Sequence, residues 1–233
     1  MKTFILLGRT NRLLLLILLT GFFAALSAGP AMAAPPTQVT CGSVITAPGQ
    51  YVLASDCMGA GITIAASDVH LKLNGHTMTG SLLGNGIMAF NRSHVHIEGP
   101  GTIRSFFNGI FLTTVSNSHV EQVTCISNQL NGLTLGGQTT DTHVNNNVFA
   151  MNANFGLATQ GGSSTSDNHL NNNQAINNAI AGIALNNGST NYHINGNTAL
   201  GNSTFDLVDG NANCDDNKWN GNTFVTANMS CIH

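Results

Sequence analysis

The chain has 233 residues, of which 7% are charged and 42% are hydrophobic. Globular domains average about 25% charged residues, and here about thirty asparagines, with serine and threonine, supply the missing polarity. The apolar fraction excludes wholesale disorder, and a formal net charge of −3 excludes the basic footprint of a nucleic-acid-binding protein.

The N-terminal segment, residues 1–33, has the pattern of a secretory signal peptide. Basic residues precede an apolar run over residues 13–28, and Ala31-Met32-Ala33 supplies the small residues that a signal peptidase accepts. The alternative is an uncleaved membrane anchor, but the apolar run is shorter than a bilayer span requires. We therefore expect a secreted, periplasmic or cell-surface protein that has no membrane span after cleavage.

Five cysteines in an exported chain suggest disulfides. Cys41 and Cys57 bracket a short segment before the regular region, and Cys214 and Cys231 bracket one after it. We predict these two local bridges, each fixing one end of the molecule, although free thiols are the alternative. Cys125 is left over, and its place in the repeat described next puts it in the core as a small hydrophobic residue.

A pair formed by glycine and a branched aliphatic residue recurs every 23 to 26 residues. Apolar residues then alternate with polar or small ones, as at Ile110 and Leu112, which is the period of a strand and not of a helix. The copies are Gly61-Ile62, Gly86-Ile87, Gly109-Ile110, Gly132-Leu133, Gly156-Leu157, Gly182-Ile183 and, in degraded form, Asp206-Leu207.

Each repeat contains two further short strands. The second is centred on Leu71, Val95, Val120, Val144, Leu170 and Ile194. The third carries Met78, Ile103, Cys125, Phe149, Ala175, Ala199 and Phe224. Three strands in about 24 residues predict one coil of a single-stranded parallel β-helix, in which each strand pairs with its copy about 4.8 Å away. A β-sandwich is the rival, but sandwiches lack a strict period with identical turn residues.

This all-β solenoid would have about seven coils and a cap at each end. We assign residues 34–60 to the N-terminal cap, 61–213 to the repeats and 214–233 to the C-terminal cap, where Trp219 would cover the last coil. Asparagines at two bends should stack and hydrogen-bond along the axis. They are Asn147, Asn173, Asn197 and Asn222 at one bend, and Asn128, Asn152, Asn178 and Asn202 at the other.

These features resemble the right-handed parallel β-helix repeat family, the pectate-lyase-like solenoids, in its secreted bacterial form. The resemblance rests on the Gly-Ile start of each coil, the asparagine that closes each second strand and the coil length. Cys41-Gly42-Ser43 through Gly49-Gln50-Tyr51, and Leu73-Asn74-Gly75-His76-Thr77, resemble the first coil of such proteins. The resemblance covers residues 41–228 and implies a right-handed coil, but this fold hosts lyases, hydrolases, epimerases and binding proteins.

The resemblance implies that catalytic groups, where they exist, lie on the outer face of the Gly-Ile strand. In this chain that face presents Met88, Phe111, Thr134, Ala158, Ala184 and Val208, none of which ionises. We therefore name no catalytic residue, and we expect Phe90 and Phe111 to be shielded by a turn. A lyase or epimerase would have to use scattered groups, namely Lys72, Arg92, Arg104, Glu98 and Glu121.

Histidine is the unusual feature of the repeat. Each copy directly precedes the inward aliphatic residue of the second strand, so alternation turns its side chain outward. His96 lies two residues from one copy on the same face and widens the column. The six histidines of the column are His70, His94, His119, His143, His169 and His193.

Three interpretations of the histidines remain open. The first is a stacked polar ladder inherited by repeat duplication. The second is a divalent metal site, since neighbouring imidazoles could share Zn²⁺, Cu²⁺ or Ni²⁺, with Asp68, Asp141 and Asp167 nearby. The third is pH sensing: repulsion between like charges would lower the pKa values below about 6.5, so stability would be lost as the pH falls below that value.

We predict an exported monomer whose long polar faces bind an extended ligand, a polysaccharide or a cell-surface component, without a required cofactor. The alternatives are a polysaccharide lyase or epimerase, and a structural or adhesive surface protein.

Overall fold

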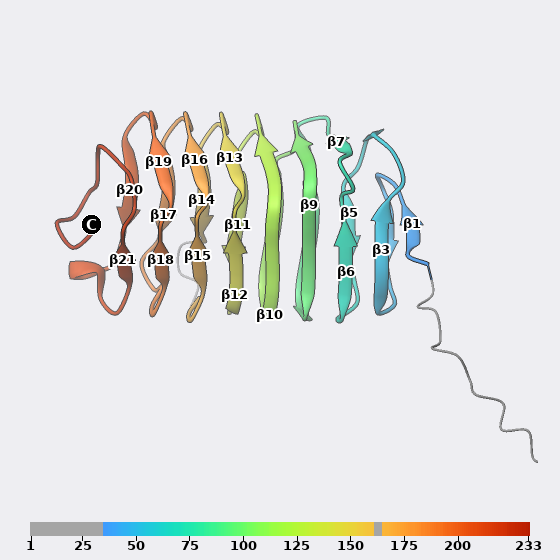
Figure 1. Ribbon diagram of the computed structural model, residues 1–233, viewed down its shortest axis with the longest axis horizontal. Coiled ribbons are helices and arrows are strands. Elements are labelled where there is room, and N and C mark those ends of the chain that lie inside the picture. The colour runs from blue at the N-terminus through green and yellow to red at the C-terminus, as the bar shows by residue number, and fades with distance from the viewer. Residues whose placement is uncertain (1–34, 161–164) are drawn as a thin grey trace, which may run out of the picture. The chain divides into compact units, whose positions relative to one another are not determined.

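The computed structural model describes residues 35–160 and 165–233, so the predicted signal peptide lies outside the described residues. The strands pair in parallel, and each pairs with its copy one coil away. Beyond Ile62, register partners in the strands of adjacent coils are 22 to 26 residues apart in sequence. Figure 1 shows β3, β6, β9, β10, β12, β15, β18 and β21 side by side in chain order. The predicted parallel β-helix is therefore confirmed.

The strands form three columns, with β9 and β10 long enough to contribute to more than one of them. The first column contains β2 (Val44–Ile45), β5 (Ile62–Ile64), β8 (Asn85–Ser93), the start of β10 (Asn108–Ile126), β11 (Leu133–Gly136), β14 (Phe155–Thr159), β17 (Ala181–Leu185) and β20 (Phe205–Asp209).

The second column contains β1 (Thr37–Val39), β3 (Gly49–Leu53), β6 (Val69–Lys72), the start of β9 (Val95–Arg104), the middle of β10, β12 (Thr140–Asn145), β15 (His169–Asn171), β18 (His193–Asn195) and β21 (Lys218–Asn220). The third contains β4 (Cys57–Met58), β7 (Thr77–Thr79), the ends of β9 and β10, β13 (Val148–Ala150), β16 (Gln174–Ile176) and β19 (Thr198–Leu200). A short 3-10 helix, η1, spans Ala212–Cys214. In the described part of the chain, no helix has the length and apolarity needed to cross a bilayer.

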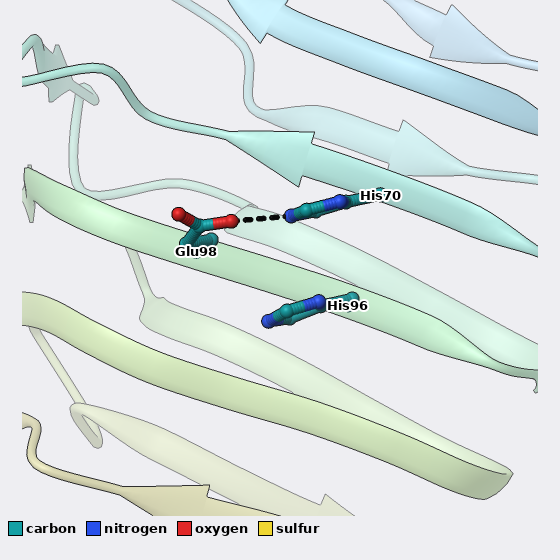
Figure 2. Close-up of side chains that lie close together, drawn as sticks. All are labelled: His70, His96 and Glu98. Carbon is teal, nitrogen blue, oxygen red and sulfur yellow. Dashed lines mark hydrogen bonds and ion pairs between the residues drawn. The ribbon is translucent and has the colours of Figure 1, made fainter.

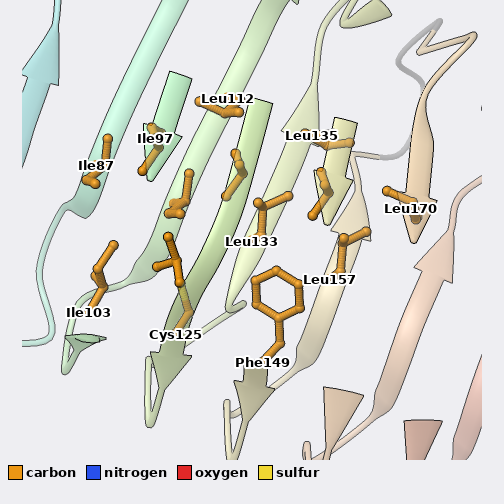
Figure 3. Packing of buried hydrophobic residues seen from close by; sticks show 14 of the residues in the cluster. Ile87, Ile97, Ile103, Leu112, Cys125, Leu133, Leu135, Phe149, Leu157 and Leu170 are labelled. Atoms are coloured by element: carbon orange, nitrogen blue, oxygen red, sulfur yellow. The ribbon is translucent and has the colours of Figure 1, made fainter. Parts of the chain in front are cut away.

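The core lies inside the coil and is built from the inward-facing side chains of the three columns, such as Ile110 and Leu112 of the first. In the third column Phe149 is fully buried and pairs with Cys125 and Ala175 in the adjacent coils, so a large side chain packs between two small ones. Figure 3 shows Phe149 beside Cys125. The predicted burial of Cys125 is confirmed, and burial raises the pKa of its thiol. The column of Gly-aliphatic pairs is likewise in register, Ile110 with Leu133 and Leu133 with Leu157.

The glycine of each pair is required by close approach to the next coil. A Cβ added to Gly132 would lie 2.6 Å from the carbonyl oxygen of Gly156, and one added to Gly156 would lie 2.6 Å from that of Gly182. Real Cβ atoms do not approach backbone oxygens so closely. Only glycine therefore fits at the start of the first-column strand, where the next coil lies against the backbone.

Buried asparagines hydrogen-bond from coil to coil at two bends, as predicted. Asn178 is typical. Its Oδ1 accepts two hydrogen bonds from Asn152, one from the backbone N–H and one from Nδ2. Its own Nδ2 donates to the carbonyl oxygen of Phe149 and to Oδ1 of Asn202. This column ends at Asp206, whose Oδ1 accepts the backbone N–H and the Nδ2 of Asn202. Each amide thus satisfies backbone groups that the bend leaves without a strand partner.

Both predicted disulfides are present, between Cys41 and Cys57 and between Cys214 and Cys231. The segment 34–60 contributes β1 to β4, and they pair with the strands that follow.

At the other end Trp219 is buried against the last coil and pairs with Ile194. Its Nε1 donates to Oδ2 of the fully buried Asp209 at 2.9 Å. Asp209 also accepts three hydrogen bonds from Asn211 and Asn217, so this carboxylate organises the C-terminal turn.

Candidate functional site

Six histidines lie outside the coil in register on the second column. Consecutive ring centroids are 4.2, 5.6, 5.0, 4.6 and 4.9 Å apart, which matches the spacing of strands in a sheet. We call this row the histidine column. Its members are His70, His96, His119, His143, His169 and His193.

The prediction that His94 belongs to this column was wrong. Val69 pairs with Val95, so His96 takes the position above His70. His94 instead occupies a bend with φ of 54°, a left-handed conformation that histidine tolerates better than most side chains. Its ring is 60% exposed and its Nδ1 lies 3.2 Å from Asp68. The second-strand position predicted for Val95 is likewise held by Ile97.

The signal that would have given the correct register is a four-residue match. Val-His-Leu-Lys at 69–72 and Val-His-Ile-Glu at 95–98 share their pattern, whereas the expected alignment relied on the nearest His-aliphatic pair. Asp141 and Asp167 also lie in left-handed bends, with φ of 48° and 55°.

Carboxylates accompany the N-terminal end of the histidine column. Oε2 of Glu98 lies 2.5 Å from Nε2 of His70 and 3.0 Å from Nζ of Lys72. Oε1 of Glu121 lies 2.7 Å from Nε2 of His96. Figure 2 shows the Glu98 carboxylate directed at His70, with the parallel ring of His96 beside it.

The first two rings, those of His70 and His96, differ from the others in having a carboxylate partner. The residue two places after each histidine is Glu98 or Glu121 in the coils of His96 and His119, but an asparagine in the next three coils: Asn145, Asn171 and Asn195. Asn171 and Asn195 donate to the amide oxygens of Asn145 and Asn171. One end of the column therefore offers anionic oxygen, and the other offers amides already bonded to one another.

The environment favours neutral imidazoles. Desolvation lowers the pKa of His70, the hydrogen bond to Glu98 opposes this, and the net direction is downward. Desolvation and the neighbouring imidazole lower the pKa of His143 and His169 as well. For Glu98, desolvation raises the pKa, but hydrogen bonds from Lys72 and His70 outweigh it and the pKa falls. A neutral imidazole beside an ionised carboxylate is a competent pair of metal donors.

The remaining charged groups that were considered for catalysis do not join this cluster. Nε of Arg104 donates to Oγ1 of Thr79 at 3.1 Å. Arg92 lines a separate hollow with Ser67 and Thr114. Only Lys72, Glu98 and Glu121 of that set lie on the histidine face.

A second candidate site is a groove of about 340 Å³ on the outer face of the first column. Its floor includes Thr134 and Ala158, and exposed or half-buried aromatic rings stand beside it. Phe111 lines the groove and is therefore not shielded by a turn as predicted, and Phe90 is 59% exposed. The lining comprises Phe107, Asn108, Phe111, Leu130, Asn131, Thr134, Asn154, Phe155, Ala158, Thr159, Gln160 and Asn186.

Sequence reasoning missed this groove because its walls come from the bends before the strands. The signal was available: Asn108, Asn131 and Phe155 occupy the same place, directly before the glycine of three successive copies. A hydrogen-bonded chain fixes the floor, in which Asn131 donates to Thr134 and Thr134 donates to Asn108.

Comparisons with solved structures find an alginate lyase and alginate epimerases. An alginate lyase from Paenibacillus sp. str. FPU-7 is 14% identical, with a TM-score of 0.62 over 75% of each chain. A mutant of the periplasmic alginate epimerase AlgG is 17% identical, with a TM-score of 0.52 over 70% of this chain. The A-module of an Azotobacter vinelandii mannuronan C-5 epimerase is 13% identical, with a TM-score of 0.51 over 79% of this chain and 64% of that one.

These likenesses, at such low identity, show a shared fold. The chain spans only 39% of the AlgG structure that it matches, and the curated proteins contain no significant sequence match. Residues 60–224 match the family described as the right-handed β-helix region. Because that match covers most of the chain and the chain folds as the corresponding solenoid, the protein belongs to the right-handed β-helix family.

Proposed function

We propose that the protein binds an extended polysaccharide along the groove on its first column. The observation that carries this proposal is the direction of the groove. Its lining comes from four consecutive coils, those of β10, β11, β14 and β17, so it runs along the coil axis for roughly 15 Å at about 4.8 Å per coil. A ligand that fills it must be elongated.

The lining has the chemistry of a sugar-binding surface. Phe107, Phe111 and Phe155 offer apolar ring surface, to which the C–H faces of a pyranose can pack. Asn154 and Gln160 are half-buried and exposed, and amides can both donate to and accept from hydroxyl groups. An apolar groove with a few converging polar groups is the usual form of a ligand site.

Binding is favoured over catalysis because no ionisable side chain lines the described part of the groove. Elimination or epimerisation at a uronate needs a base and a cation to neutralise the carboxylate. The similar solved structures include an alginate lyase and alginate epimerases, and for this reason a lyase or epimerase activity remains the second candidate.

The experiment measures binding to soluble alginate, pectate, hyaluronate and a neutral glucan by affinity electrophoresis. We expect retardation by at least one polymer, and loss of it in Phe111→Ala and Phe155→Ala. Phe90→Ala is the matched control, since this exposed phenylalanine belongs to the same face but not to the groove lining. Retardation that survives both groove variants would contradict the proposed site.

The same polymers serve to test whether the protein only binds a polysaccharide or also modifies it. Incubation of the protein with each uronate polymer is followed by ultraviolet absorbance of unsaturated uronates and by proton NMR of the uronate epimers. Neither signal is expected to change. Turnover that Arg104→Ala abolishes would establish an enzyme and overturn the proposal.

A further inference from the structure

We propose that His70, His96 and Glu98 form a binding site for one divalent transition-metal ion, with Zn²⁺ as the probe. The site lies on the second column and is independent of the groove. It uses the N-terminal end of the histidine column, where two stacked imidazoles and a carboxylate converge (Figure 2).

The distances suit a shared ion after small side-chain rotations. One donor atom from each of the three residues lies within 4.8 Å of the other two. Zn²⁺ binds imidazole nitrogen and carboxylate oxygen at about 2.0–2.2 Å, which places tetrahedral ligands roughly 3.4 Å apart. The rings of His70 and His96 are parallel within 6°, with centroids 4.2 Å apart. Because an imidazole nitrogen coordinates through a lone pair in the ring plane, at least one of the two rings must turn out of the stack to share an ion with the other.

The strands hold the donors in place. His96 and Glu98 are two residues apart on β9 and therefore point to the same side, and His70 is the register partner of His96 on β6. The side chains of His70, Glu98 and His96 are 21%, 26% and 30% exposed. They are thus partly desolvated but open to solvent, which leaves a coordination position for water or an incoming ligand.

The donor set also indicates which ions are excluded. Two imidazoles and one carboxylate suit Zn²⁺, Ni²⁺ or Cu²⁺, whereas Ca²⁺ and Mg²⁺ prefer sets composed of oxygen. Glu121 contacts His96 at 2.7 Å and is placed as the outer carboxylate that commonly orients a metal-bound histidine.

Lys72 distinguishes a metal site from a purely structural histidine ladder, because its removal should change metal affinity in the opposite direction from the stability of an ion-pair network. Its Nζ lies 3.0 Å from the Glu98 carboxylate and competes with a cation for the same oxygen. Removal of the ammonium group should strengthen metal binding, while it would weaken an ion-pair network.

The C-terminal end of the same column supplies a matched control. His169 and His193 are also stacked, at 4.9 Å, but asparagines occupy the adjacent positions where His70 has Glu98. Two imidazoles without the third ligand should contribute little to binding of a single ion.

The test is Zn²⁺ titration by calorimetry of the oxidised protein purified without an affinity tag. We expect one ion per chain, at least tenfold weaker binding in Glu98→Gln and in His96→Asn, several-fold tighter binding in Lys72→Met, and unchanged binding in the double variant His169→Asn/His193→Asn. Excess Ca²⁺ should not compete. Circular dichroism and the melting temperature of each variant establish that it is folded.

Co²⁺ provides a spectroscopic readout that is independent of the heat of binding measured by calorimetry. Its visible absorption is expected to show the intense bands of a tetrahedral nitrogen–oxygen site, and to lose them in Glu98→Gln. Absence of Zn²⁺ binding by the wild-type protein would overturn the proposal, as would an equal loss in the control double variant or weaker binding in Lys72→Met. None of these outcomes bears on the groove, because no glycan is present.

Discussion

The interior asparagine column and the exterior histidine column are produced by the same repeat but have different physical roles. Inside, each amide of the Asn152–Asn178–Asn202 row is buried and makes hydrogen bonds to the next amide and to backbone groups. Outside, the rings stack at similar spacing but are in part exposed. Repetition inside the coil satisfies the backbone, whereas repetition outside leaves nitrogen donors available.

The comparison teaches that burial, and not periodicity, decides what a repeated polar residue does. A buried amide column cannot change one member without leaving neighbours unsatisfied. An exposed column can be varied coil by coil, as happens where Glu98 and Glu121 give way to asparagines.

The largest effect should come from breaking the interior column. Asn178→Ala removes the acceptor of two groups of Asn152 and the donor to the carbonyl of Phe149, and we expect a loss of about 3 kcal/mol or more in the free energy of unfolding. Asn171→Ala, which breaks half-buried side-chain hydrogen bonds between amides on the histidine face, should cost less, about 1 kcal/mol, because water can reach and replace the amide. Urea unfolding measures both, and similar losses would remove the distinction between the two kinds of column.

A smaller effect should come from the residue that ends the interior column. Oδ2 of Asp206 accepts the backbone N–H groups of Val225 and Thr226, and Asp206→Asn replaces that acceptor, at an expected cost of about 2 kcal/mol at neutral pH.

The same variant has a pH signature. Desolvation raises the pKa of Asp206, but hydrogen bonds from Val225, Asn202 and Thr226 outweigh it and hold the pKa below its ordinary value. The carboxylate therefore stabilises the fold above the unfolded-state pKa of about 3.9, and this contribution is lost as the pH falls through the folded-state pKa. The difference in stability between wild type and Asp206→Asn should shrink below about pH 4; a constant difference would show that ionisation is not involved.

The smallest effect should come from the exterior column. Desolvation and the neighbouring His119 lower the pKa of His143, which also faces His169 and Asp141, the last of which opposes the shift. A lowered pKa means that the unfolded chain takes up protons first, so stability is lost as the pH falls below about 6.5.

We therefore expect metal-free wild-type protein to lose slightly more melting temperature between about pH 7.5 and about pH 5 than His143→Asn, by roughly 1–3 °C. His233→Asn, a change outside the column, is the control. Identical pH profiles for all three proteins would show that the column does not sense protons.

The coil could be predicted because its constraints repeat in the sequence. A glycine whose Cβ would meet the next coil, and an asparagine whose amide must reach the next bend, therefore recur at a fixed place in most of the coils. The positions of the cysteines relative to the repeat predicted the two disulfides and the burial of Cys125.

The sites were harder to predict because they depend on departures from the repeat. The coil from His70 to His96 is longer than average, and that difference misplaced His94. The contact of Glu98 with His70 joins residues on diagonal positions of adjacent coils, which no spacing along one strand reveals. The groove arises where side chains from successive bends line up. Bends lack the alternation of apolar and polar residues from which the direction of a strand side chain is predicted.

The aspartate at position 206 has a consequence for the evolution of length. Along the interior row, Nδ2 of Asn128, Asn152 and Asn178 each donates a hydrogen bond to Oδ1 of the asparagine in the next coil. An ionised carboxylate accepts hydrogen bonds but cannot donate one, so the row of side-chain amide donors ends at Asp206, and only its backbone N–H donates onward, to Oγ1 of Thr226. Duplication of a middle coil can lengthen the solenoid upstream of this aspartate, whereas a copy added after it would begin without a side-chain amide donor from the preceding coil.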